Sequence, residues 1–226
     1  MTSVAFDCDA VLFDMDGTIV DSKHIVERMW IAWASEHGLA IADALAVAHG
    51  RRTLETMTLL APHLATPEEA ARLDALESEQ DGGETAIPGA FDLLSALPPD
   101  RWAIVTSAGR ALARGRIESV RLPAPRVVVG ADDVVAGKPS PEGYLQAAER
   151  LGVDARRCVV IEDTPAGAEA GRAAGATVIG LATTFPTLSC CDVLVDDLRA
   201  VRAAASADGW GIRLVIDLDS IVSRSG

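Results

Sequence analysis

Several features that mark other classes of protein are scarce or missing in this chain of 226 residues. It has no run of 18 apolar residues, which excludes a membrane-spanning helix. Basic side chains number 20 against 33 acidic ones, so the formal net charge is −13. Because a charge of that sign repels phosphate backbones, we expect no binding to nucleic acid.

Cysteines are also few, and their spacing does not suggest a disulfide framework. The four cysteines form no C-x-x-C pair, and the adjacent Cys190 and Cys191 cannot easily bridge each other; the other two are Cys8 and Cys158. Residues 1–9 lack the basic segment and long apolar stretch of a secretory signal. Free thiols suit a reducing compartment, so we expect a cytoplasmic protein.

The hydrophobic content of 49% and charged content of 23% are ordinary for a packed globular protein. Short apolar runs alternate with stretches of helical pattern, which is typical of βαβ units and a parallel sheet. We therefore predict an α/β fold with a doubly wound, Rossmann-like parallel sheet, and an additional edge strand at 213–218. The predicted parallel strands are residues 10–14, 102–106, 126–130, 158–162, 176–181 and 192–195.

Helix boundaries are marked by proline and glycine. Ser140-Pro141 predicts an N-cap with proline at the first helical position, and Thr164-Pro165 repeats the pattern. Gly152 and Gly175 are expected to end these two helices.

The stretch between Ile19 and Ile87 contains no convincing strand, although it separates the first predicted strand from the second. A crossover needs only a dozen or so residues, so this stretch is predicted to be an inserted helical domain. We expect the core at 1–18 and 88–226, the inserted helices at 19–87, and an exit linker at 78–84. Ile25, Met29 and Trp33 have helical spacing and are expected to face the core of the insertion.

Ligands of such sheets bind beyond the carboxyl ends of the strands. Polar residues lie at the ends of three predicted strands: Asp14, Asp16 and Thr18; Thr106 and Ser107; and Glu162 and Asp163. After the predicted strand at 126–130, a loop leads to Lys138. Each of these short motifs alone is more often a turn, a helix cap or a solvated loop. All four in this order, each at or beyond the end of its own strand, indicate a functional site.

The carboxylates, hydroxyls and lysine at these strand ends and in the loop could act together in one reaction. Several carboxylates in one crevice require a divalent cation, and hard oxygen ligands suit Mg²⁺. Asp14 and Asp16 leave an extended segment on the same face, so one could attack phosphorus while the other handles a proton. Gly17 allows a close turn. Lys138 could pair with Asp14 and a phosphoryl oxygen, and the hydroxyls after residue 105 could hold the remaining oxygens.

These motifs resemble the four motifs of the haloacid-dehalogenase-like phosphohydrolases: DMDGT at 14–18, TS at 106–107, KP at 138–139 and ED at 162–163. The insertion falls where that superfamily has its helical cap. HGRRT at 49–53, IPGA at 87–90, GKPSPEGYL at 137–145 and the segment 162–185 are similar to phosphatases of small polyol and sugar phosphates, such as glycerol-phosphate and 2-deoxyglucose-6-phosphate phosphatases.

The resemblance implies a role for each matched residue. Asp14 would be the nucleophile that forms an aspartyl-phosphate, and Asp16 the general acid and then the base. Mg²⁺ would be held by the Asp14 carboxylate, the Asp16 carbonyl and Asp163, with Glu162 acting through water. Ser107 and Lys138 would bind the transferring phosphoryl group, supported by Thr106 and Thr18.

In the insertion, Arg52 matches an arginine that reaches the substrate in relatives, and Arg51 is the less favoured candidate. His24, Lys23 and His49 are weaker candidates for substrate contact. The β-phosphoglucomutase relatives have a histidine where this chain has Val26, which argues against a mutase.

We therefore predict a Mg²⁺-dependent phosphatase, monomeric by default, acting on a small phosphorylated polyol or sugar. A phosphosugar mutase is the alternative within the same chemistry. A receiver-type signalling module, which also has a phosphorylatable aspartate, is the alternative from another class. Receivers are about half this length and lack both the insertion and the Asp14-x-Asp16 pair.

Overall fold

The predicted parallel strands lie in one sheet of the computed structural model, which describes residues 3–79, 83–206 and 211–224. The strand order is β12-β9-β8-β7-β2-β5-β6, and every pairing is parallel except that of β12 with β9. The strands are β2 (Ala10–Phe13), β5 (Trp102–Val105), β6 (Val127–Val129), β7 (Cys158–Glu162), β8 (Thr177–Leu181), β9 (Val193–Val195) and β12 (Ile221–Arg224). The predicted α/β fold is confirmed.

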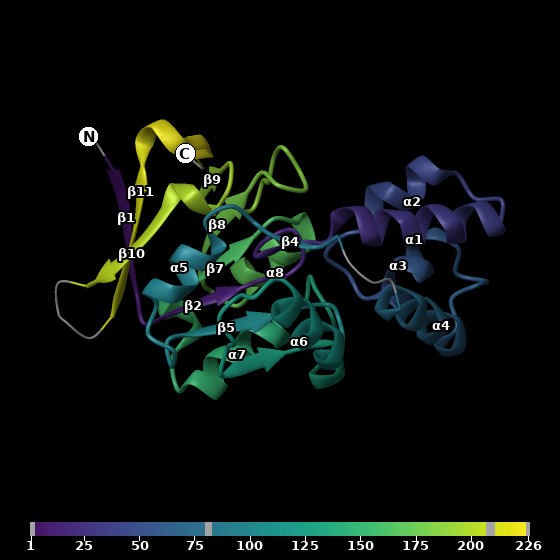
Figure 1. Ribbon diagram of the computed structural model, residues 1–226, viewed down its shortest axis with the longest axis horizontal. Helices are drawn as coiled ribbons and strands as arrows, with labels where there is room; N and C mark the ends of the chain where they lie inside the picture. Colours follow the sequence, from purple (N-terminus) through teal and green to yellow (C-terminus); the bar gives the residue numbers. More distant parts are fainter. Residues whose placement is uncertain (1–2, 80–82, 207–210, 225–226) are drawn as a thin grey trace.

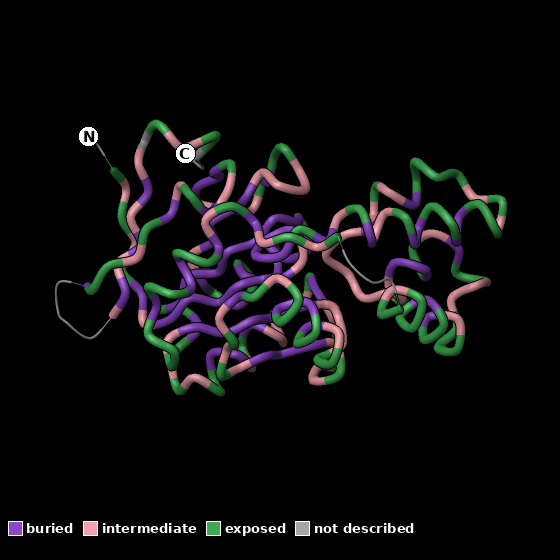
Figure 2. Tube along the Cα trace, viewed as in Figure 1, coloured by how far each residue is buried: buried purple, intermediate pink, exposed green. Residues whose placement is uncertain are grey.

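Helices cover both faces of this sheet, which explains why its central strands are apolar throughout. One face packs on α7 (Glu142–Leu151) and α8 (Pro165–Ala173), and the other on α5 (Ala90–Ala96) and α6 (Arg110–Ser119). Within β2, for example, Leu12 belongs to the hydrophobic cluster on the face covered by α7 and α8, and Phe13 belongs to the cluster on the opposite face. Figure 2 shows the resulting concentration of buried chain along the strands.

A second, three-stranded sheet corrects the prediction for 213–218. That segment corresponds to β11 (Ile212–Asp217), which is the central strand between β1 (Ser3–Cys8) and β10 (Val201–Ala205), not an edge of the main sheet. Its alternating burial matches a sheet with one covered face. The pairing joins opposite ends of the chain, with Phe6 opposite Leu214. The antiparallel edge of the main sheet is β12 instead.

Residues 23–78, which follow the first parallel strand, form four helices with a hydrophobic core of their own, which we call the helical unit. They are α1 (Lys23–Glu36), α2 (Ile41–Val47), α3 (Thr53–Leu60) and α4 (Pro67–Ser78). Trp30, Trp33 and Met57 are at most 2% exposed in its centre. Figure 1 shows this unit at one end of the molecule and the second sheet at the other.

The chain enters and leaves the helical unit through two short strands, which the sequence did not lead us to expect. β3 (Val20–Asp21) pairs antiparallel with β4 (Thr85–Ala86), so the two connections run side by side. Part of the predicted exit linker, residues 80–82, lies outside the described residues.

Local capping agrees with the sequence at one of the two predicted helix starts. The Thr164 hydroxyl accepts a hydrogen bond from the Gly167 amide, and Pro165 begins α8 as expected. In contrast, α7 begins at Glu142 rather than at Pro141. The hydroxyl of Ser140 bonds the Glu142 amide, so it closes a turn just before the helix. The described residues also form four short 3-10 turns: η1 (Ala131–Asp133), η2 (Ala155–Arg157), η3 (Leu198–Ala200) and η4 (Leu218–Ser220).

Two expectations from the sequence concern membrane-spanning helices and disulfide bonds rather than the fold. No helix within the described ranges is long and apolar enough to cross a membrane. All four cysteines are free.

Candidate active site

A buried lysine lies between two carboxylates that the sheet brings together. Asp14 directly follows β2, and Glu162 is the last residue of the neighbouring strand β7. The Lys138 ammonium contacts Oδ1 of Asp14 and lies 2.6 Å from Oε1 of Glu162. None of the three residues is more than 5% exposed. Burial opposes the charged lysine, but Asp14 and Glu162 outweigh it and raise the pKa of Lys138 well above its usual value.

Glu162 has hydrogen bonds at both carboxylate oxygens. Oε1 also accepts a bond of 3.0 Å from the Tyr144 hydroxyl. Oε2 accepts bonds from the amides of Asp163 and Thr164 and from the Thr164 hydroxyl, at 2.9, 3.0 and 3.0 Å. The carboxylate is therefore fixed in place, and it fixes Lys138 in turn.

Two other carboxylate oxygens in the same cluster form no hydrogen bond of normal geometry with any described residue. They are Oδ2 of Asp14 and Oδ2 of Asp163, and both are buried. Ligand atoms of Asp14, Asp163 and Glu162 all lie within 4.8 Å of one another. Buried polar atoms are normally satisfied, so this pair of oxygens fits the binding of a cation. An oxygen-only donor set fits a hard divalent ion such as Mg²⁺.

The electrostatics of the two aspartates agree with this interpretation. Burial, followed by the charge of Glu162, raises the pKa of Asp163 to about 7. Burial also raises the pKa of Asp14 well above its usual value, although Lys138 opposes the shift. Both carboxylates are unfavourable as anions in this cluster unless a cation compensates them.

Gly17 makes the close packing of this cluster possible. Its φ of +85° lies in the left-handed region, and a Cβ at this position would be 2.0 Å from Oδ2 of Asp163. Only glycine lets the loop after β2 pass at this distance. The buried Thr18 next to it donates a hydrogen bond of 3.0 Å to Oδ1 of Asp163. The Thr18 hydroxyl is thus engaged by an aspartate, which differs from the phosphate contact that we expected of it.

Asp16 lies at the edge of this cluster and is held by residues that the sequence analysis did not single out. Its Oδ1 accepts hydrogen bonds of 2.6 Å from both Ser22 and Arg116. Among the described residues, its Oδ2 has only a contact of 3.5 Å with the Thr106 hydroxyl. Arg116 belongs to α6, and a helical arginine gives no signal in sequence that it will be buried.

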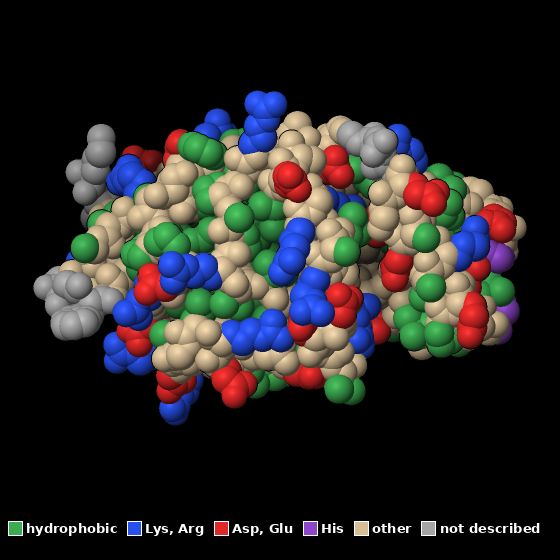
Figure 3. Space-filling model, turned by 60° about the horizontal axis from the view of Figure 1, so that its bottom comes forward, with side chains coloured by type: hydrophobic (Ala, Val, Ile, Leu, Met, Phe, Trp, Pro, Cys, Tyr) green, Lys and Arg blue, Asp and Glu red, His purple; other side chains and the backbone are tan. Residues whose placement is uncertain are grey.

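A cavity of about 670 Å³ opens between the core and the helical unit, at the junction of the two parts in Figure 3. Asp14, Asp16, Thr106 and Ser107 line it from the core. The Ser107 hydroxyl donates to the carbonyl of Gly50 in the helical unit at 3.0 Å, and Thr106 accepts from the Ala108 amide at 3.1 Å. Lys138 lines a smaller adjoining pocket together with Thr106 and Ser107.

Arg52 lines the cavity, but its guanidinium is already engaged. It binds Glu55, at 2.9 and 2.5 Å, and the carbonyls of Val134 and Val135 in the core, at 3.3 and 2.9 Å. Arg51 donates to the carbonyl of Lys138 at 3.3 Å. Both arginines therefore join the helical unit to loops of the core.

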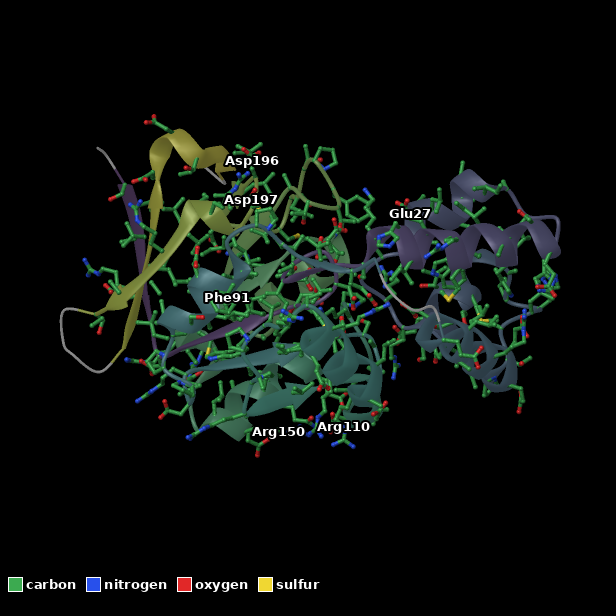
Figure 4. The ribbon with its side chains drawn as sticks, in the orientation of Figure 1. Glu27, Phe91, Arg110, Arg150, Asp196 and Asp197 are labelled. Atoms are coloured by element: carbon green, nitrogen blue, oxygen red, sulfur yellow. The ribbon has the colours of Figure 1, made fainter. Side chains whose placement is uncertain are left out.

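The weaker candidates for substrate contact in the helical unit differ in whether they line the cavity. His49 lines the cavity, with Nε2 3.5 Å from Glu27 and its ring against Phe185 of the core. Figure 4 places Glu27 on α1, near the end of this helix that faces the core. Burial lowers the pKa of His49, although Glu27 opposes the shift. Lys23 pairs with Glu27 at 3.9 Å and His24 lies against Gly83, and neither lines the cavity.

The fold and this cluster have features that suit an enzyme for phosphoryl transfer: an aspartate after the first parallel strand, a buried lysine on that aspartate and an unsatisfied pair of carboxylate oxygens. Residues 8–175 match the family model of the haloacid dehalogenase-like hydrolases, and the chain belongs to this family. Its members generally use Mg²⁺, and an aspartyl-phosphate intermediate is typical of those that hydrolyse phosphate esters.

Individual relatives cover nearly the whole chain. Hexitol phosphatase A of Escherichia coli is 40% identical over 209 residues, which are 89% of this chain and 97% of the relative. Glycerol-1-phosphate phosphohydrolase 2 of Saccharomyces cerevisiae is 36% identical, covering 86% and 84%. The crystal structure of a hydrolase from Pseudomonas syringae superposes with a TM-score of 0.70 at 27% identity, covering 84% of this chain and 93% of the other.

Proposed function

We propose that this protein is a Mg²⁺-dependent phosphatase that hydrolyses the phosphate monoester of a small, uncharged polyol or sugar. The observation that carries the proposal is the pair of buried, unpartnered oxygens on Asp14 and Asp163 beside the Lys138–Asp14 contact. This arrangement offers a cation site, a nucleophile and a phosphate-binding cation within one cluster.

The residues divide the reaction between them. The Asp14 carboxylate attacks phosphorus, and the bond from phosphorus to the leaving oxygen breaks as Asp16 donates a proton to that oxygen. Asp16 then removes a proton from the water that attacks the phosphorus of the aspartyl-phosphate, which releases inorganic phosphate and restores Asp14. Lys138, held by Glu162, stabilises the phosphoryl oxygens, and Ser107 and Thr106 bind them from the neighbouring loop.

Asp14, Asp163 and the main-chain carbonyl of Asp16 would hold Mg²⁺, with Glu162 in contact through water. The ion, when bound, neutralises the carboxylates and the charge on the transferred group. Thr18 supports this site by orienting Asp163.

The charge of the cavity wall limits the leaving group. Acidic side chains of the wall include Glu55, Asp74, Glu77 and Asp132. The arginines of the wall, Arg51, Arg52 and Arg116, already bind carbonyls or carboxylates. Among the described wall residues these four carboxylates outnumber the three arginines, and Arg52 and Arg116 are paired with Glu55 and Glu77. A hydroxyl-rich neutral leaving group is therefore favoured over one that carries a second phosphate or a carboxylate. The named substrates of the hexitol and glycerol phosphatases have this chemistry.

The helical unit is proposed to act as the cap that selects the leaving group. At the position where mutases of the family have a histidine, Val26 lines the cavity with an apolar side chain that cannot transfer a proton. This favours hydrolysis over transfer to a second hydroxyl. A cytoplasmic location and a monomeric state remain predictions.

The proposal is tested by incubating the protein with a panel of phosphomonoesters and Mg²⁺, and measuring released inorganic phosphate. We expect turnover of hexitol, glycerol and 2-deoxyglucose phosphates and much slower turnover of phosphoglycolate and sugar bisphosphates. Asp14→Asn should remove the activity. The phosphatase proposal is wrong if the panel yields no phosphate, or if Asp14→Asn retains full activity; isomerised sugar phosphate without phosphate release would identify a mutase.

A further inference from the structure

Arg116 connects the acid/base candidate Asp16 with the helical unit. Its Nη1 lies 2.6 Å from Oδ1 of Asp16, and its Nη2 lies 2.7 Å from Oε1 of Glu77 in the last turn of α4. A third carboxylate, Glu84 on the return connection, lies 3.9 Å from Nε. The arginine side chain is 2% exposed. One buried guanidinium from the core therefore bridges the site and the helical unit.

The way in which Asp16 is held indicates what this bridge does. Ser22 and Arg116 both bind Oδ1, whereas Oδ2 has only the long contact with Thr106 in the part of the chain that the structure describes. This leaves Oδ2 available to donate or accept a proton at the cavity. The only cation that contacts the Asp16 carboxylate within the described residues is Arg116.

Glu77 in turn holds Arg116. Burial raises the pKa of Glu77, although Arg116 opposes the shift. Burying an arginine is costly unless its donors are paired, so the guanidinium keeps this position only while its carboxylate partners are present. Glu77 reaches it because α4 lies against the core, as in this structure.

We propose that Arg116 is a positioning residue for proton transfer by Asp16, and that Glu77 makes this positioning depend on the closed arrangement of the helical unit. The inference rests on the proposed phosphatase function. It assigns to Arg116 no contact with the substrate. Under this proposal, Asp16 transfers a proton at the full rate only when the helical unit covers the cavity.

The experiment compares two aryl phosphates of similar shape, 4-nitrophenyl phosphate and phenyl phosphate. The nitrophenolate leaves readily without a proton, whereas the phenolate needs one, and kcat/KM reports the steps up to its departure. General acid catalysis contributes about 100- to 10,000-fold. We expect Arg116→Met to lower kcat/KM about 100-fold for phenyl phosphate and less than about 10-fold for the nitrophenyl ester. Equal losses for the two esters would show that Arg116 is only structural.

Glu77→Gln supplies an independent measurement, because it retains the shape of the side chain and removes its charge. The variant should show the same selective loss for phenyl phosphate in a weaker form. In the Arg116→Met background it should have no further effect, because Glu77 acts through Arg116. An additive loss in the double variant would overturn the proposal. If Arg116→Met does not fold, the two esters measured on Glu77→Gln alone decide the question.

Arg150→Met is the matched control, since Arg150 also pairs with a carboxylate, Asp133 at 2.8 Å, but does not line the cavity. Figure 4 labels it in α7, within the core. It should leave both kcat/KM values unchanged. If the unaltered protein hydrolyses neither aryl ester nor any polyol phosphate, the phosphatase function itself fails. If the unaltered protein is active and Arg116→Met lowers kcat/KM equally for the two esters, only the proposed role of Arg116 is wrong.

Discussion

The ammonium group of Lys138 lies 2.6 Å from Oε1 of Glu162, a carboxylate whose other oxygen accepts three hydrogen bonds. Glu162 is thus anchored independently of the lysine. Lys138 comes from a long loop, so Glu162 provides the rigid point that directs its charge toward Asp14. This relationship makes Glu162 important for Lys138 even without direct contact with a substrate.

Replacement of Glu162 tests that relationship. Glu162→Gln should lower phosphate release at least about 10-fold and lower the free energy of unfolding by about 3 kcal/mol, because it removes one charge of a buried pair. Tyr144→Phe, which removes only a hydrogen bond to the same oxygen, should cost about 1 kcal/mol. Phosphate assays and urea unfolding measure both. Equal effects of the two substitutions would show that the charge of Glu162 does not matter.

Mg²⁺ should stabilise the fold through Asp14 and Asp163. At a concentration about 100 times its Kd, a ligand of the native state adds about 2.7 kcal/mol, which raises the midpoint of thermal unfolding. Asp163→Asn should abolish this increase, and without Mg²⁺ it should unfold at the same or a higher temperature, because one buried charge is removed. Asp132→Asn, on the exposed cavity wall, is the control that keeps the increase. Removal of Mg²⁺ with EDTA should stop phosphate release.

Substitutions at two glycines with positive φ distinguish the effect of backbone strain from the effect of crowding at the site. Gly38→Ala should cost about 1–2 kcal/mol of stability and Gly17→Ala at least as much, because both place alanine in the left-handed region. A Cβ at position 38 has no atom within 4 Å, whereas one at position 17 collides with Asp163. Only Gly17→Ala should therefore lose activity, by about 100-fold. Similar phosphate release by the two variants would contradict the packing argument.

The ion pairs of Glu69 predict a pH dependence of stability. Hydrogen bonds from Arg72 lower the pKa of Glu69 to about 2 from its ordinary value of 4.5, so its contribution is complete above about pH 4.5 and is lost as the pH falls toward 2. Glu69→Gln should cost about 1 kcal/mol at pH 7. Urea unfolding at pH 7 and pH 3 should show this difference shrinking in acid. Glu68→Gln, on the same exposed turn, serves as control; a pH-independent difference for Glu69→Gln would refute the assignment.

The central sheet could be predicted because its information is local. Runs such as Cys158–Glu162 are apolar throughout, and Thr164-Pro165 marks the start of the next helix within a few residues. The parallel topology then determines that the polar residues after each strand meet at one edge. The meeting of Asp14, Glu162 and Asp163 follows from these two facts, whereas Lys138 reaches them from a loop well beyond the end of β6.

The second sheet could not be predicted in the same way. β1 and β11 pair residues from the two ends of the chain, and each strand on its own is a weak alternating pattern. Tyr144 and Arg116 were also missed, because an aromatic or basic residue in an amphipathic helix gives no local sign of the carboxylate that it will meet.

The order of residues along the chain thus determines which chemical groups reach the sheet edge, since strand direction and loop position depend on short-range pattern. The partners of those groups are decided by the folded molecule. The Thr18 hydroxyl donates a hydrogen bond to Asp163. Arg52 donates to the carbonyls of Val134 and Val135, and Arg116 donates to the carboxylates of Asp16 and Glu77. The pairings of Arg52 and of Arg116 with Glu77 depend on how the helical unit and the core approach each other, whereas Thr18 meets Asp163 through the packing of two loops of the core. Burial makes an unpaired polar group costly in each case.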